Sequence, residues 1–149
     1  MGYTHYWTHS DTFTQSEWNQ IEIDVKDILT LAVADGLELA DAMGENLITP
    51  DMAIVKGTMI MFNGLGGLGH ETFGLSMLHG GWDFCKTARK PYDVAVTAIL
   101  AYLESAYPEK FSVGSDGDAD DWKPAMALLK RMGTRAAFVQ IPKEVRADS

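Results

Sequence analysis

The clearest hydrophobic pattern in the sequence belongs to an amphipathic helix near the N-terminus. Thr14 and Glu17 have the spacing of a capping box, in which each side chain accepts a hydrogen bond from the other residue's backbone amide. The apolar residues that follow recur at intervals of three and four, which places them on one helical face. They are Trp18, Ile21, Val25, Ile28, Leu29 and Ala32. Because glycine adopts the left-handed backbone of a helix C-terminus, Asp35-Gly36 ends the predicted helix.

Short runs of β-forming residues predict strands on both sides of this helix. Residues 2–9 are rich in aromatic residues and threonine and form the first strand. Further strands are expected at residues 37–42, 58–62, 82–86, 111–113 and 137–141. Asn63-Gly64 is a turn signal after the third strand, and the glycine-rich stretch from there to Gly81 predicts a meander of loops, in which residues 70–73 resume an extended pattern.

Two more helices follow from their start and stop signals. The second begins near Pro91, because proline is favoured in the first helical turn, and Pro108 closes it. The third has Asp118 as its N-cap and stops at Gly133. The predicted fold class is therefore α+β, with a small mixed or antiparallel sheet packed with three helices in the order β-α-β-β-β-α-β-α. Residues 1–149 are expected to form a single domain.

Composition narrows the class of function. The chain of 149 residues has a formal net charge of −9 and a pI near 4.7. Since neutralisation of phosphates dominates nucleic-acid affinity, we expect no general nucleic-acid binding. Cys85 is the only cysteine, which excludes an internal disulfide and a cysteine zinc cluster and favours a cytoplasmic location. No apolar stretch is long enough to cross a bilayer, so no membrane association is predicted either.

One basic segment stands out in this acidic chain. Residues 86–90 contain three of the twelve Lys and Arg and lie just before the predicted second helix, where the helix dipole favours an anion. A phosphate there would receive a bidentate contact from Arg89. The predicted ligand-binding residues are Lys86, Arg89, Lys90, Tyr3, Trp7 and Tyr92. The alternative is a solvated basic turn, or an ion pair between Arg89 and an acidic residue.

Three residues are candidates for acid–base catalysis, namely His5, His70 and Glu71. Histidine titrates near neutral pH and a neighbouring carboxylate can assist it, so a hydrolase or phosphodiesterase is an alternative function. No His-Glu-x-x-His helix is present to fix a set of metal ligands. In the absence of such a set, the sequence favours the interpretation of each histidine as a packed or surface residue.

An acidic segment begins like a calcium loop. Asp116 and Asp118 alternate as EF-hand ligands do, but Asp121 and Ala127 stand where that loop requires Gly and Glu. Helix capping explains Asp118 without a metal. Asp116 and Asp118 remain candidates for magnesium, and no cofactor is predicted.

A glycine cluster contains the spacing of a dinucleotide-binding loop, Gly64-x-Gly66-x-x-Gly69. That motif requires a following helix, whose N-terminal amides hold the pyrophosphate. No helix is predicted after Gly69, so a tight structural loop is expected. Cys85, beside Phe84, is interpreted as a core residue.

Five short blocks carry a resemblance to known proteins. They are Gly2-Tyr3-Thr4-His5-Tyr6-Trp7, Phe62-Asn63-Gly64, His70-Glu71-Thr72-Phe73, Cys85-Lys86-Thr87-Ala88-Arg89-Lys90-Pro91-Tyr92-Asp93 and Ser115-Asp116-Gly117-Asp118. Together they resemble a group of small, uncharacterised bacteriophage and prophage proteins. The resemblance implies a phage-associated accessory protein in the host cytoplasm and, by analogy, one that counters a host defence by sequestering a nucleotide signal. It implies no established chemistry.

The leading hypothesis is therefore a binding protein for a small phosphorylated or nucleotide-like ligand. The alternatives are the metal- or histidine-dependent hydrolase and a protein inhibitor that docks on a host enzyme.

Overall fold

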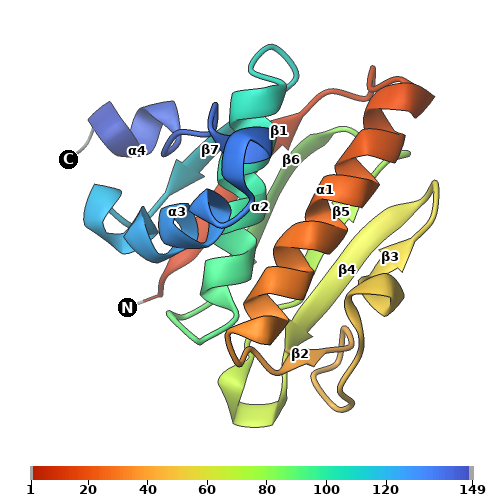
Figure 1. The fold of residues 1–149 in the computed structure, drawn as a ribbon, viewed down its shortest axis with the longest axis vertical. Helices are drawn as coiled ribbons and strands as arrows, with labels where there is room; N and C mark the ends of the chain where they lie inside the picture. The colour runs from red at the N-terminus through yellow and green to blue at the C-terminus, as the bar shows by residue number, and fades with distance from the viewer. Residues whose placement is uncertain (1, 148–149) are drawn as a thin grey trace.

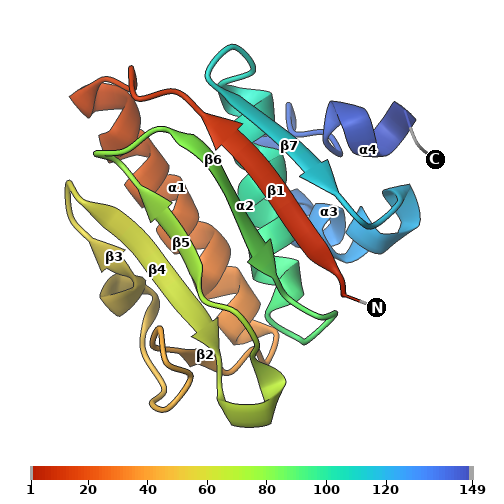
Figure 2. The ribbon, with the colours of Figure 1, turned by 180° about the vertical axis from the view of Figure 1, so that it is seen from behind.

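Strands and helices form two separate layers in the computed structural model, which describes residues 2–147 (Figures 1 and 2). The strands are β1 (Thr4–His9), β2 (Leu39–Ala40), β3 (Ile54–Val55), β4 (Met59–Gly64), β5 (Phe73–Ser76), β6 (Gly81–Lys86) and β7 (Phe111–Ser115). The helices are α1 (Gln15–Ala34), α2 (Asp93–Ala106), α3 (Lys123–Lys130) and α4 (Lys143–Ala147). This arrangement confirms the predicted α+β class.

The N-terminal strand occupies the centre of one of the two small sheets. The strand order there is β6-β1-β7, and both pairings are antiparallel. The second sheet has the order β2-β4-β3, with β5 also paired to β4, and it too is antiparallel. Because β1 is central, His5 lies opposite Cys85 on one side and Ser115 on the other. Three distant parts of the sequence therefore meet at its start.

The helices α1, α2 and α3 lie on one side of the strand layer, and α4 lies beside its edge strand β7. Figure 2 shows the strands in front, with α1 and α2 behind them. Alternate side chains of a strand point to opposite faces, so His5 and Trp7 are buried toward the helices while Tyr6 and Thr8 face the other way. The apolar face of α1 predicted from its periodicity is buried, and the capping box of Thr14 and Glu17 is formed. The core thus lies between the two layers.

Several expected elements differ in the structure. The predicted strand 137–141 is wrong, because this segment has an irregular backbone. It leads into α4, a fourth helix that the sequence did not predict. The third helix does not begin at Asp118, which instead caps a 3-10 turn over Ala119–Trp122. Pro124 lies in the first turn of α3, a place where its missing N–H costs nothing.

The predicted turn at Asn63-Gly64 is also wrong, because both residues belong to β4. The Asn63 side chain is buried, and its hydrogen bonds hold the loop after β4 as backbone hydrogen bonds would hold a turn. Its Oδ1 accepts from the amides of Gly64 (2.8 Å) and His70 (3.1 Å), and its Nδ2 donates to the carbonyls of Ala42 and His70. The true chain reversal comes later, in the 3-10 turn Gly66–Leu68.

Between residues 2 and 147, none of the helices combines the length and the apolar character that crossing a bilayer demands.

Candidate functional site

Three segments meet where β1 begins and α2 begins. Because β6 and β7 run antiparallel to β1, the C-terminal ends of both strands flank the start of β1. The loop after β6 (residues 87–92) leads into α2, and the loop after β7 (residues 116–118) leads toward α3. Antiparallel pairing therefore gathers the N-terminal block, the basic segment and the acidic segment of the sequence.

A chain of hydrogen bonds links these segments through His5. Its Nε2 lies 2.6 Å from Asp93 Oδ1, and its Nδ1 lies 2.8 Å from Ser115 Oγ. The hydroxyl of Thr87 donates to the same oxygen of Asp93 at 2.5 Å, and the amide of Gly117 donates to Ser115 Oγ at 2.9 Å. His5 has no exposed surface, so this chain is a buried junction between β1, α2 and β7.

The partners in this chain of hydrogen bonds determine which atoms donate and which accept. An ionised Asp93 can only accept, so a proton on His5 Nε2 satisfies that contact. Nδ1 is then free to accept the hydroxyl proton of Ser115, whose oxygen accepts in turn from Gly117. Serine, histidine and aspartate thus follow the order of a hydrolase triad, but the ring nitrogens are exchanged, since Nδ1 faces the serine here and Nε2 does so in that triad.

The loop before α2 holds two residues in the left-handed region. Ala88 has φ of 52° and Arg89 has φ of 59°, although neither is glycine. The loop is held in place by the bond from the Ala88 amide to the Tyr3 carbonyl (3.2 Å) and by that from Lys90 to Thr87 (3.0 Å). Left-handed backbone costs about 1–2 kcal/mol for a residue with a Cβ. Such strain, kept by surrounding contacts, concentrates at functional sites.

We expect Ala88→Gly to raise the free energy of unfolding by up to about 1 kcal/mol. Glycine relieves the left-handed strain, while its freedom in the unfolded chain offsets part of the gain. The matched control is Ala127→Gly at an exposed position of α3, which should cost about 1 kcal/mol. Urea denaturation measures both changes, and a loss at Ala88 as large as that at Ala127 would contradict the strain.

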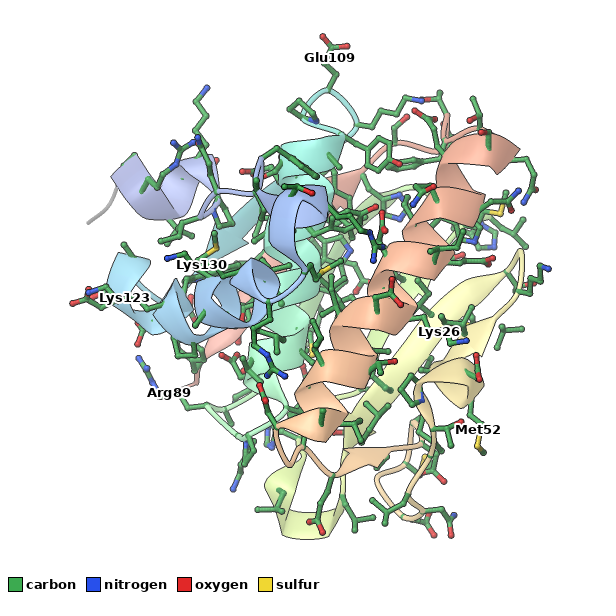
Figure 3. The ribbon with its side chains drawn as sticks, in the orientation of Figure 1. Lys26, Met52, Arg89, Glu109, Lys123 and Lys130 are labelled. Carbon is green, nitrogen blue, oxygen red and sulfur yellow. The ribbon has the colours of Figure 1, made fainter. Side chains whose placement is uncertain are left out.

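Arg89 covers the site from the outside. Its guanidinium lies 4.0 Å from the centroid of the Tyr3 ring, and its Nη1 donates to Asp121 Oδ1 at 2.7 Å. The hydrogen bond from Arg89 is the main reason why the pKa of Asp121 is lowered. Figure 3 shows Arg89 at the edge of the molecule, on the side of α3. This contact is an ion pair between Arg89 and an acidic residue, the alternative to phosphate binding that the sequence left open.

Tyr3 contributes a polar group with no partner. Its side chain is only 5% exposed, and its hydroxyl has no hydrogen bond of normal geometry within residues 2–147. Burial, followed by the negative charges of Asp93 and Asp121, raises its pKa, while Arg89 and the Ser115 hydroxyl oppose part of this rise. A buried hydroxyl without a partner is costly, and it stands directly beside the His5 chain.

A small cavity of about 190 Å³ opens beside these residues. Its lining consists of Tyr3, Arg89, Lys90, Pro91, Asp93, Val94, Thr97, Asp121 and Pro124. Ser115 is not among them, so a molecule in the cavity would meet Asp93 rather than the serine. Oδ1 of Asp93 is held by His5 and Thr87, and Oδ2 has no partner in the described range.

The predicted ligand-binding residues separate into three groups. Arg89, Lys90 and Tyr3 line the cavity. Lys86 is the last residue of β6, and its side chain lies along Gly2 instead. The remaining two are buried in the core, with Trp7 1% exposed and Tyr92 completely covered.

The predicted catalytic residues also separate. His5 lies in the chain described above, whereas the side chain of His70 is exposed beyond β4. Glu71 Oε1 accepts from the Lys86 amide at 2.7 Å, and the Glu71 carbonyl accepts from the Tyr92 hydroxyl at 2.5 Å. Glu71 thus fastens the loop after β6 to the second sheet, without a contact to His5.

The two carboxylates considered for magnesium already have protein partners. Asp116 accepts from the Thr4 amide (3.1 Å) and the Tyr6 hydroxyl (2.7 Å). Asp118 forms the capping box with Asp121, as expected. Over residues 2–147, no group of three or more His, Cys, Asp or Glu is arranged to hold a metal ion. Cys85 is buried, which raises its pKa to about 12 and agrees with its interpretation as a core residue.

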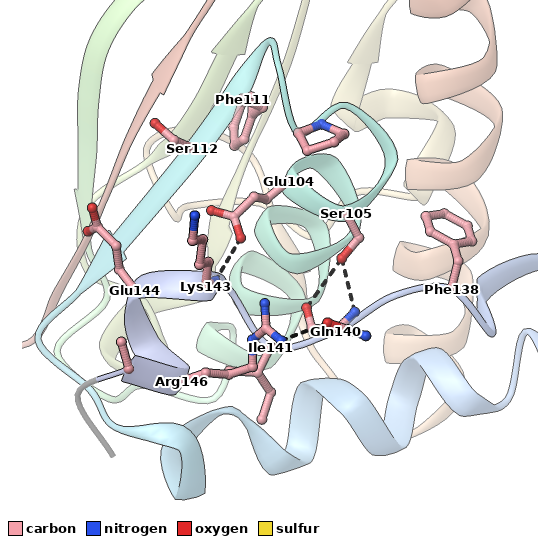
Figure 4. Close-up of a pocket in the computed structure, with 12 residues that line it drawn as sticks. Glu104, Ser105, Phe111, Ser112, Phe138, Gln140, Ile141, Lys143, Glu144 and Arg146 are labelled. Atoms are coloured by element: carbon pink, nitrogen blue, oxygen red, sulfur yellow. Dashed lines mark hydrogen bonds between the residues drawn. The ribbon is translucent and has the colours of Figure 1, made fainter.

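A larger cavity of about 610 Å³ lies elsewhere, between the end of α2, β7 and the C-terminal segment (Figure 4). Its central polar groups are already satisfied. Glu104 accepts from the amides of Val113 and Lys143, and Ser105 exchanges hydrogen bonds with the backbone of Gln140. These contacts fasten the C-terminal segment to α2, so the smaller cavity is the better functional candidate.

Five residues of the candidate site were missed as functional residues by sequence reasoning, namely Thr87, Asp93, Ser115, Gly117 and Asp121. All but Asp121 fall within the blocks that resemble phage proteins. Their place in these blocks was the one signal in the sequence that could have identified them. Comparison with protein-family models, with curated proteins and with solved structures finds no match to this chain. Evidence on function therefore comes from the geometry of the site.

Proposed function

We propose that the cavity at the start of α2 binds a small phosphorylated ligand, such as a sugar phosphate or the phosphoribose end of a nucleotide. The observation that carries this proposal is Lys90, which lines the cavity and whose ammonium group has no ion-pair partner in the described part of the chain. Arg89 lies beside it and donates to Asp121 through Nη1, so its remaining N–H groups are free to bind phosphate oxygens.

The acidic part of the lining favours a ligand that also carries hydroxyl groups. Asp93 would repel a bare phosphate, but its free Oδ2 accepts a hydrogen bond from a hydroxyl. A sugar phosphate satisfies both kinds of group at once. The cavity of about 190 Å³ is smaller than the roughly 300–1,000 Å³ of most ligand pockets, so it suits a phosphopentose and leaves a nucleobase outside.

The resemblance to bacteriophage proteins supports an extension of this proposal. A phage accessory protein in the host cytoplasm that holds a nucleotide-like defence signal would need such a site and no catalytic turnover. This extension rests on the resemblance, whereas the ligand class rests on the lining of the cavity.

Hydrolysis is a second candidate function, favoured by the Ser115–His5–Asp93 chain. With its proton on Nε2, His5 could take the hydroxyl proton of Ser115 and activate it as a nucleophile. Since Ser115 does not line the cavity, a substrate would have to approach it from another side.

Calorimetric titration with ribose 5-phosphate, AMP and cyclic AMP tests the binding proposal. We expect ribose 5-phosphate to bind and ribose not to bind, with an affinity that falls as salt rises. Lys90→Ala should weaken binding about ten-fold, because it removes a charged hydrogen-bond donor. The matched control is Lys130→Ala, which removes the same charge at the end of α3 (Figure 3).

Equal affinities of the Lys90 and Lys130 variants, or no binding by any compound, would contradict the proposal. Phosphorus NMR of the same mixtures separates the two candidate functions. A ligand that keeps its phosphate resonance over hours is bound only, whereas growth of a product resonance that Ser115→Ala abolishes would establish hydrolysis instead.

A further inference from the structure

The face of the first sheet that points away from the helices carries exposed aromatic side chains. Tyr6 lies opposite Phe84, and Thr8 lies opposite Trp82, so all four point to this face. Trp82 is 63% exposed and Phe84 is 44% exposed. In Figure 2 this face lies toward the viewer, and no helix of the described chain crosses it. Exposed aromatic clusters of this kind are typical of interaction sites.

The three rings form a continuous row. Tyr6 stacks on Trp82 with centroids 6.2 Å apart and planes inclined by 23°. Trp82 in turn contacts Phe84 at 5.3 Å. The tyrosine is fixed by its hydrogen bond to Asp116, so the row is a preformed surface rather than a set of independent side chains.

A carboxylate stands across a groove from this row. A cavity of about 210 Å³ is bounded by Tyr6, Trp82 and Glu144, together with residues 112–114 of β7. Glu144 belongs to α4 and lies beside β7, where it borders both this groove and the larger cavity (Figure 4). Its side chain is exposed and makes no hydrogen bond or ion pair within residues 2–147. The groove thus combines aromatic faces with an unpaired negative charge.

We propose that this groove, lined by Tyr6, Trp82 and Glu144 and continued by the adjoining ring of Phe84, binds an arginine- or lysine-rich peptide segment of a partner protein. A cation placed over the tryptophan gains a cation–π contact, and its N–H groups donate a charge-assisted hydrogen bond to the Glu144 carboxylate. The net charge of −9 attracts a basic segment over a longer range. The groove and the phosphorylated-ligand site have no residue in common.

Stacked aromatic residues on an open sheet also bind single-stranded nucleic acid in other proteins. The charges here oppose that occupant. Asp116 and Glu144 border the row, while Lys86 is the single cation of β1 and β6 and lies along Gly2 at the far end. A nucleic-acid backbone would require several cations along its path.

Fluorescence anisotropy of a fluorescein-labelled hexa-arginine peptide tests the proposal on the full chain. Trp82→Ala should weaken binding by at least about five-fold, and Glu144→Gln by about two- to five-fold. The control Glu109→Gln changes the charge equally at an exposed loop position (Figure 3), and it should bind as the unchanged protein does. Since the other three tryptophans are at most 1% exposed, quenching of the exposed tryptophan should accompany binding.

Three results would overturn the proposal. One is the absence of peptide binding at low salt. Another is equal affinity of the Trp82, Glu144 and Glu109 variants, which would reduce the effect to general attraction by an acidic protein. The third is tighter binding of a labelled oligothymidylate than of the peptide. Circular dichroism of each variant verifies that its fold is retained.

Discussion

Replacement of His5 by alanine should lower the free energy of unfolding by about 3 kcal/mol. The imidazole is completely buried and is the only link between Ser115 and Asp93 in the chain described above. Its loss leaves both partners short of a hydrogen bond and opens a cavity between the rings of Tyr3 and Trp122, which contact it edge-on at 5.0 and 5.2 Å. The melting temperature should fall by roughly 10 °C.

The control for this experiment is His70→Ala. The side chain of His70 is exposed, and only its backbone takes part in the contacts with Asn63. We expect a change within about 0.5 kcal/mol. Similar losses for the two variants in urea denaturation would show that the chain through His5 does not stabilise the fold.

Gly64→Ala should destabilise the fold by about 3 kcal/mol as well. A Cβ at this position would lie 2.4 Å from the carbonyl oxygen of Leu68 and 2.9 Å from Cα of Gly69. Both are backbone atoms of the loop that folds back on β4, so neither can move as a flexible side chain would. Close backbone approach therefore accounts for the glycine without a bound phosphate.

Gly67→Ala is the matched control within the same cluster. A Cβ there meets no atom within 4 Å. Its effect should lie within about 0.5 kcal/mol. Denaturation curves that coincide for the two alanine variants would contradict the close packing of Gly64 against the loop.

Local patterns predicted the elements whose stability is local. The capping box and the apolar periodicity of α1 act within a few residues. The β-forming side chains of β1 likewise predicted that strand from its own sequence. The prediction for the segment 137–141 was wrong because the structure of that segment depends on distant contacts. Its irregular course depends on contacts with the distant Ser105, and no pattern within the segment reveals them.

The candidate site was only partly accessible to sequence reasoning for the same reason. His5 and Asp93 are 88 positions apart, and His5 and Ser115 are 110 apart. Only the central place of β1 in its sheet brings them into contact. The basic segment was recognisable from its charges, but the strand ends before Arg89, so Lys86 and Lys90 point to different surfaces.

Backbone amide chemical shifts, measured while ribose 5-phosphate is added to the protein, test the proposed ligand site most directly. We predict that the largest changes occur in the loop of residues 87–92, at Asp93 and Val94 at the start of α2, and at Tyr3 and Asp121, and that Lys90→Ala suppresses them. Shifts that cluster around the larger cavity near Glu104, or no shifts at millimolar ligand, would contradict it.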